Sequence, residues 1–246
     1  GLMSQLIGGE DEPRSSSGAT MAASRTAAQP TVDEPDPVEP EAPAQEPAAA
    51  PEPEPGPAEE EPEASRLQAA IERVYGTFEP VYIDGHGSQV IELPGEHGIV
   101  TATGNGSGNF VVNVLDENNE STGDLLVNTI GAYEGTTFYG RGWGTPAWLE
   151  VVADGPWSIA IEPVSYAAEI ALPGEGVGDA VYLYGGGSGA WTFTHEGQSN
   201  FVVYEYGSGI MPLRINEIGQ YTGQVPIRKG PAVIVVIADG WWSVTP

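Results

Sequence analysis

A seven-residue phrase occurs twice in this chain, as ADGPWSI at residues 153–159 and as ADGWWSV at residues 238–244. Both phrases close a series of matched segments that run in the same order. Residues 85–90, 99–103 and 109–112 match 176–181, 190–194 and 200–203 at an offset of 91, residues 128–135 match 216–223 at 88, and the heptapeptides match at 85. Because loops tolerate deletions better than strands do, this shrinking offset predicts two related domains in tandem, residues 78–163 and 164–246.

The pattern of residue types in both copies predicts an all-β fold. Short runs of Val, Ile, Thr and aromatic residues alternate with Gly, Asn and Asp, which is typical of an antiparallel β-sandwich or a barrel-like unit. In WSIAI, the alternation places Trp157 and Ile159 on one face of a strand and Ser158 on the other. The expected strands of the first copy are QVIEL, IVTAT, NFVVNVL, DLLVNTI, TTFYG, AWLEVV and WSIAI.

Residues 1–64 are rich in Glu, Pro and Ala and contain no aromatic residue. Such a segment buries too little apolar surface to offset the entropy lost on ordering, so we expect a disordered, acidic, Pro-rich tether. A short recognition motif for a partner is the alternative interpretation. The apolar start, GLMSQLIGG, suggests either a membrane anchor upstream of residue 1 or the edge of an internal fragment.

Residues 65–77 predict one short helix. Ser65 and Gln68 have the spacing of a capping box, and Gly76 can end the helix. Its apolar face holds Leu67, Ala70, Ile71 and Val74. A helix this short is unstable alone in water, so it should dock, and we expect it to close one end of the first domain.

Charge and cysteine content exclude several classes of function. The net charge is −27, and residues 65–246 alone carry 20 acidic side chains against 6 basic ones. Nucleic acids and anionic lipid surfaces would repel such a surface. The chain has no cysteine, which excludes disulfides, thiolate metal sites and a Cys nucleophile.

Four pairs of repeated residues have structural interpretations: Asn128 and Asn216, Gly131 and Gly219, Tyr133 and Tyr221, and Trp157 and Trp242. The glycines should adopt positive φ in a turn. The tyrosines could bond a backbone carbonyl at a corner between strands, and the asparagines could cap the same turn. The tryptophans should anchor the two cores.

No pattern in the chain predicts catalysis, so we expect no catalytic residue and no cofactor. The histidines His86, His97 and His195 lack metal-ligand spacing. The Gly-rich stretches GNGSGN and GGGSGA precede strands, so no helix terminus is available there to bind phosphate.

Loop 116–124, DENNESTGD, resembles the start of an EF-hand, with Asp116, Asn118 and Glu120 at ligand spacing. Ser121 stands where glycine is expected, and Val127 replaces the closing glutamate. A hairpin loop is the favoured interpretation. We predict no metal site, and the sequence leaves calcium binding by this loop open.

Three residues form the candidate binding surface: Arg141, Trp143 and Trp241. Trp143 lies in a loop without counterpart in the second copy. Trp241 replaces Pro156 of the first phrase and precedes Trp242, so the two neighbouring rings must point to opposite faces of their strand. The outward ring could stack on a sugar, touch a partner or pack against the other domain, and we favour the last.

The combination of NFVV, NxIGxYxG and ADGxWS resembles a repeated domain of actinobacterial cell-surface proteins. The resemblance covers residues 79–246 and carries no known active site. It implies an extracytoplasmic module displayed from the cell envelope, with a protein or glycan partner and a membrane contact only through an anchor. More distantly, the pattern is similar to pre-peptidase C-terminal and carbohydrate-module sandwiches.

We therefore expect a non-enzymatic module for adhesion, assembly or ligand presentation. One alternative is a carbohydrate-binding module that uses an exposed tryptophan. A second is a non-catalytic fragment of a secreted hydrolase. The sequence leaves the oligomeric state open.

Overall fold

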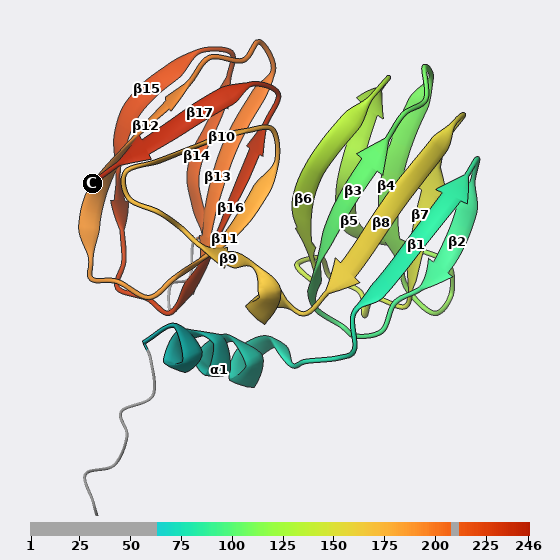
Figure 1. Ribbon diagram of the computed structural model, residues 1–246, viewed down its shortest axis with the longest axis horizontal. Coiled ribbons are helices and arrows are strands. Elements are labelled where there is room, and N and C mark those ends of the chain that lie inside the picture. Colours follow the sequence, from blue (N-terminus) through green and yellow to red (C-terminus); the bar gives the residue numbers. More distant parts are fainter. Residues whose placement is uncertain (1–62, 208–211) are drawn as a thin grey trace, which may run out of the picture. The chain divides into compact units, whose positions relative to one another are not determined.

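The computed structural model describes residues 63–207 and 212–246, and it is an all-β fold with one α-helix (Figure 1). The predicted tether, residues 1–64, lies outside the described residues except for its last two. The strands form four sheets, which pair face to face as two sandwiches. All the strand pairs are antiparallel except β9 with β11. The predicted fold class is confirmed.

The helix α1 spans Glu63–Tyr75. It starts before the expected cap, so Ser65 lies in its first turn instead of preceding it. Gly76 ends the helix as predicted, with φ +77 and its N–H donating to the Glu72 carbonyl at 2.8 Å.

Two of the four residues expected on the apolar face of α1 are buried, Leu67 and Ile71. Val74 is 65% exposed, so that part of the prediction is wrong. Tyr75 takes its place, because its ring packs edge-on against Phe138 with the ring centroids 5.5 Å apart.

The first sandwich consists of two four-stranded sheets with the orders β1-β8-β3-β6 and β2-β7-β4-β5. All seven expected strands form. Sequence reasoning missed β1, in which an Asp-Gly pair interrupts the apolar pattern. Its strands are β1 Val81–His86, β2 Gln89–Glu92, β3 Gly98–Gly104, β4 Asn109–Leu115, β5 Ser121–Ile130, β6 Tyr133–Tyr139, β7 Trp148–Val152 and β8 Pro156–Glu162.

The second sandwich follows a short 3-10 helix, Val164–Tyr166. Its sheets have the orders β10-β17-β12-β15 and β14-β13-β16-β11-β9, so the strand order of the first sandwich recurs with β9 added. Its strands are β9 Ala168–Glu169, β10 Gly174–Val177, β11 Ala180–Tyr184, β12 Gly189–His195, β13 Asn200–Tyr206, β14 Leu213–Ile218, β15 Tyr221–Ile227, β16 Ala232–Ala238 and β17 Trp241–Thr245.

Strand β16 is apolar along its whole length because both of its faces are covered. Ile234 and Val236 face the core of the second sandwich, whereas Val233 and Val235 face a third apolar cluster. A continuous apolar run is typical of a strand buried on both sides.

The third apolar cluster joins α1 to both sandwiches. Its buried members are Leu67, Ile71, Ile99, Phe138, Val164, Ala167, Val181, Leu183, Val233 and Val235. The helix was expected to close only the first domain. It also packs on the second, because the outer face of β11 and β16 offers it an apolar surface.

Candidate functional site

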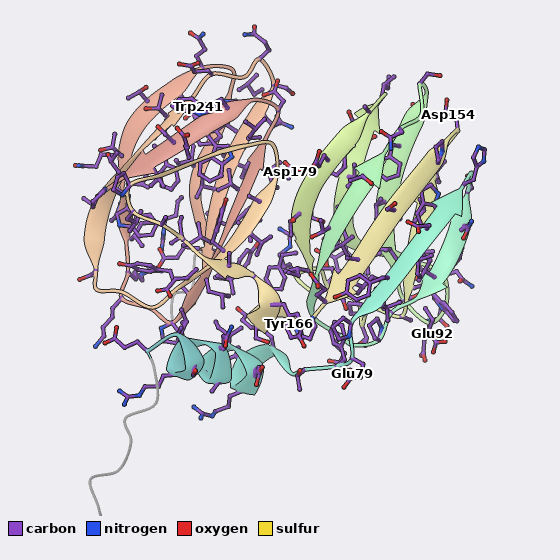
Figure 2. The ribbon with its side chains drawn as sticks, viewed as in Figure 1. Glu79, Glu92, Asp154, Tyr166, Asp179 and Trp241 are labelled. Carbon is purple, nitrogen blue, oxygen red and sulfur yellow. The ribbon has the colours of Figure 1, made fainter. Side chains whose placement is uncertain are left out.

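The aspartate of the repeated phrase binds a neighbouring loop in each sandwich. Asp154 Oδ2 accepts hydrogen bonds from the Ser107 N–H at 3.1 Å and the Gly108 N–H at 2.7 Å. The Gly108 bond stabilises the charged carboxylate and so lowers the pKa of Asp154. Asp154 lies at the turn between β7 and β8 (Figure 2). It therefore ties this turn to the loop between β3 and β4.

The second copy repeats this arrangement. Asp239 Oδ2 accepts hydrogen bonds from the N–H groups of Gln198 at 2.9 Å and Ser199 at 2.8 Å. The aspartate of the phrase is thus part of the framework in both sandwiches.

The glycine of the phrase allows the two loops to touch. A Cβ on Gly155 would lie 2.8 Å from the Gly106 Cα, and a Cβ on Gly240 would lie 2.7 Å from the Gly197 Cα. Side chains at these positions would push the backbones apart.

The tryptophan of the phrase anchors each core. Trp157 is 2% exposed and Trp242 is 1% exposed, as the strand alternation predicts. Each indole N–H donates to a carbonyl of a turn that crosses between the two sheets: Trp157 to Gly87, between β1 and β2, at 2.8 Å, and Trp242 to Gly178, between β10 and β11, at 3.0 Å. The repeated phrase therefore encodes one structural unit twice.

Gly131 and Gly219 adopt φ +91 and +84. Their N–H groups donate to the carbonyls of Gly108 at 2.8 Å and Ser199 at 2.7 Å. This turn therefore binds the same loop as the aspartate of the repeated phrase, Asp154 or Asp239, at the same end of its sandwich.

The two repeated asparagines do not cap that turn. Asn128 lies within β5 opposite Val111, and Asn216 lies within β14 opposite Val202. Both side chains are exposed. The capping prediction is therefore wrong, because the strands continue beyond these residues to the turn.

The repeated tyrosines differ from each other in their surroundings. Tyr133 donates its hydroxyl proton to Asp179 Oδ2 at 2.8 Å, not to the expected backbone carbonyl. The rings themselves pack alike, Tyr133 on Phe110 with centroids 5.8 Å apart and Tyr221 on Phe201 with centroids 5.7 Å apart. Both hydroxyls lie over the glycine two residues later in their own strands.

Asp179 connects the two sandwiches. Besides Tyr133, its carboxylate accepts a hydrogen bond from the Ala238 N–H at 2.9 Å. Its carbonyl oxygen accepts the Thr136 N–H of β6 at 2.9 Å. Burial raises the pKa of the Asp179 carboxyl and, together with that carboxylate, also raises the pKa of Tyr133.

Arg141 was expected at an open binding surface, and its position shows that this is wrong. Its side chain is 16% exposed and lies over the rings of Phe138, Tyr204 and Tyr206 at 5.8 to 5.9 Å. Its Nη1 donates to the Tyr206 hydroxyl at 3.3 Å, and its Nε lies 3.7 Å from Asp124 Oδ1. Arg141 therefore links β6 of the first sandwich to β13 of the second through cation–π contacts.

The loop that follows β6 is held by a buried carboxylate. Asp124 is 3% exposed, and its Oδ2 accepts the N–H groups of Gly140 at 2.8 Å, Arg141 at 2.9 Å and Gly142 at 3.2 Å. Asp124 thus fixes the backbone conformation of this loop.

Trp143 is presented by this loop. Its backbone N–H donates to the Thr122 carbonyl at 2.9 Å, and its side chain is 87% exposed. A Cβ on Gly123 would lie 2.7 to 2.8 Å from three ring atoms, so the ring rests on the Gly123 backbone. Its opposite face is open to solvent.

Trp241 points out of its sandwich, as expected, but it does not pack against the first one. It lies opposite Val177 of β10, which is 74% exposed, on the outer face of the β10-β17-β12-β15 sheet (Figure 2). The third cluster lies on the other sheet, at β11 and β16. The inter-domain contact predicted for Trp241 is therefore wrong, since the opposite layer of the sandwich makes that contact.

Sequence reasoning missed the role of His195. This side chain is 1% exposed and stacks on Phe201 with the ring centroids 4.5 Å apart. Its Nδ1 lies 2.8 Å from the Gly219 carbonyl oxygen, and its Nε2 lies 3.4 Å from Asp239 Oδ1. The signal was available, because the matching position in the first copy is Gly104, so the second core must hold an additional ring.

A buried ion pair was also missed. Arg214 Nε lies 2.7 Å from Glu205 Oε2, and Glu205 Oε1 accepts the Arg228 N–H at 3.0 Å. The pair joins β13, β14 and the end of β15.

Asp116 stabilises the loop that resembles an EF-hand. Its Oδ1 accepts the N–H groups of Asn118 at 2.8 Å and Glu120 at 2.9 Å, and the Glu120 bond lowers the pKa of the carboxyl. In the described part of the chain, no group of three or more His, Cys, Asp or Glu side chains is arranged to hold a metal ion. Within residues 63–207 and 212–246, no helix has the length and apolar character needed to cross a membrane.

No family model matches this sequence, and no curated protein matches it. Among solved structures, the chain is similar to a conserved protein of unknown function from Pseudomonas aeruginosa PAO1, with a TM-score of 0.23 and 11% sequence identity. The match covers 68% of this chain and 78% of that one.

Proposed function

We propose that this protein is a non-enzymatic extracytoplasmic module, displayed from the cell envelope for assembly, adhesion or ligand presentation. One observation carries the proposal: the buried or hydrogen-bonded side chains named next, which are capable of acid–base chemistry, hold loops and strands of the fold together. Asp154 and Asp239 bind loop amides, His195 lies between a carbonyl and a carboxylate, and Asp124 holds the β6–β7 loop. A general base must instead reach the proton of a substrate.

The charge of the folded part supports partners other than nucleic acids and anionic membranes. Its 20 acidic and 6 basic side chains repel phosphate backbones and anionic lipids and favour solubility. A module of this charge meets neutral or cationic partners more readily than nucleic acids.

Surface display can be tested on intact cells that make the protein. Added protease should remove the folded module from intact cells, with a cytosolic protein as the control that survives until lysis. Protection of the module until lysis would contradict the proposal.

Glycan binding at Trp143 is a second candidate function, favoured by the ring that rests on Gly123 with its other face open. Sugar rings present apolar C–H faces that stack on such a platform. Titration with a panel of oligosaccharides should quench tryptophan fluorescence, and Trp143→Ala should abolish the change. Trp241→Ala is the matched control and should leave it intact. Equal responses from wild type and Trp143→Ala would exclude this site.

A further inference from the structure

The second sandwich has a covered sheet face, whereas the matching face of the first, called the bare face below, is covered only in part: Leu115 is buried, but several apolar side chains are exposed. In the second, the outer face of β11, β16 and β13 packs in the third cluster. The matching face of the first, on β2, β7, β4 and β5, holds four exposed apolar side chains. These are Val90 at 58%, Leu125 at 51%, Val152 at 37% and Ile130 at 77% exposure.

The two faces differ in charge. At the offsets of the repeat, Glu92 of β2 matches Leu183 of β11, and Glu150 of β7 matches Val235 of β16. Glu92 lies at the end of β2 and is exposed (Figure 2). Two carboxylates therefore stand where the covered face has aliphatic side chains.

These carboxylates lie where the covered face receives a cation. There, Arg141 sits over Tyr204 and Tyr206. Tyr204 and Tyr206 on β13 pair with Val235 and Val233 on β16.

The matching cation position on the bare face combines carboxylates with an aromatic ring. Asn113 and Leu115 take the places of the two tyrosines, and their register partners are Glu150 and Trp148. Trp148 is itself opposite Glu92. The bare face thus retains the features of a site for a cationic side chain.

The second sandwich presents such a cation at the place that matches Arg141. Strand β15 ends at Ile227 and continues into Arg228 and Lys229, as β6 ends at Tyr139 and continues into Gly140 and Arg141. Both Arg228 and Lys229 are exposed. Strand β15 is the edge of its sheet, like β6 of its own.

We propose that the edge of β15 in one molecule, with Arg228 and Lys229, docks on the outer face of β2 and β7 in a second copy of this chain. Glu92 and Glu150 receive the two cations, and the exposed aliphatic side chains are buried around them. Within one molecule, β6 and Arg141 of the first sandwich pack on the outer face of the second. The proposed contact between two molecules has the same arrangement, with β15 in the place of β6.

The two surfaces lie on different sandwiches, so the contact is head to tail. Heterologous contacts of this kind generate open chains of molecules. The inference rests on the proposed function and names its assembly role. Association is measured on purified protein and display on cells, so the failure of one is distinguishable from the failure of the other.

Sedimentation velocity of the full chain in about 0.15 M salt, where long-range repulsion is screened, tests the proposal. The average mass of the wild type should rise with protein concentration. Arg228→Glu/Lys229→Glu should weaken association roughly tenfold or more, and so should Glu92→Lys/Glu150→Lys. The second variant is informative because it lowers the net negative charge, which by itself would favour association.

The four-residue variant that combines both reversals should regain association, because the reversed charges again pair. Arg66→Glu/Arg73→Glu on α1 is the matched control, with the same change in charge as the β15 variant and an expected wild-type mass profile. A wild type that stays monomeric at all concentrations would overturn the proposal. So would a four-residue variant that associates no better than its two halves.

Discussion

The hydroxyl of Tyr133 in the first sandwich donates a hydrogen bond to the carboxylate of Asp179 in the second, at 2.8 Å. The repeat matches Asp179 with Ser88 and Tyr133 with Tyr221. One copy therefore supplies the donor and the other the acceptor, and the contact is made once per chain. This asymmetry makes the boundary between the sandwiches a specific interface instead of a flexible link.

Asp179 should make stability fall as pH rises. Burial raises its folded pKa above the ordinary value of 3.8, so the folded state binds this proton more tightly than the unfolded state does. Between 3.8 and the raised value the unfolded state has already lost the proton, so stability decreases with pH and stays lower above that window.

Asp179→Asn should remove this contribution while it keeps an acceptor for Tyr133. Relative to wild type, the variant should therefore be more stable at pH 7 than at pH 4, so its free energy of unfolding minus that of the wild type, measured by chemical denaturation, should be larger at pH 7. A difference that is independent of pH, or of the opposite sign, would contradict the assignment.

The two core tryptophans, Trp157 and Trp242, should contribute far more to stability than the outward-facing Trp241. Trp157→Ala and Trp242→Ala should each cost about 3–5 kcal/mol, because each removes a fully buried ring. Trp241→Ala should cost clearly less, since its ring lies on the outer face of β17. Urea denaturation of the three variants checks the order, and a loss at Trp241 equal to that at Trp242 would be inconsistent with it.

Replacement of Arg141 should uncouple the sandwiches. Arg141→Ala removes the cation from three aromatic rings but keeps the backbone N–H that binds Asp124. We expect calorimetry to show two separate unfolding transitions where the wild type shows one. Arg73→Ala on the exposed side of α1 is the control and should retain a single transition.

Replacement of Gly155 or Gly240, which lie where two turns touch, should lower the stability of the protein. Gly155→Ala and Gly240→Ala force a Cβ against backbone atoms at 2.8 and 2.7 Å, so each should cost about 1–3 kcal/mol. Gly187→Ala is the control, because no atom lies within 4 Å of a Cβ at that position. Equal thermal midpoints for all three variants would show that the turns can separate freely.

The two sandwiches should superpose strand for strand in a crystal structure of the protein. Their sheets have the same strand order, and Trp157 should fall on Trp242 and Tyr133 on Tyr221. Unrelated positions for these pairs would refute the duplication read from the matched segments.

The sequence alone determined most of the strands of the first sandwich and the tryptophans that anchor each core. Alternation in β8 predicted burial of Trp157 and Ile159, and positive φ was predicted at Gly131. Such features depend on neighbours within a few residues, so periodicity and turn chemistry record them locally.

Only the tertiary structure decided what lies beside the polar and aromatic side chains. Arg141 bonds with Tyr206 65 residues away, and Tyr133 bonds with Asp179 46 residues away. These partners belong to different sandwiches, so no local pattern relates them. Trp241 shows the same limit: alternation determined that its ring points outward, but only the packing of the opposite sheet determined that it does not face the first sandwich.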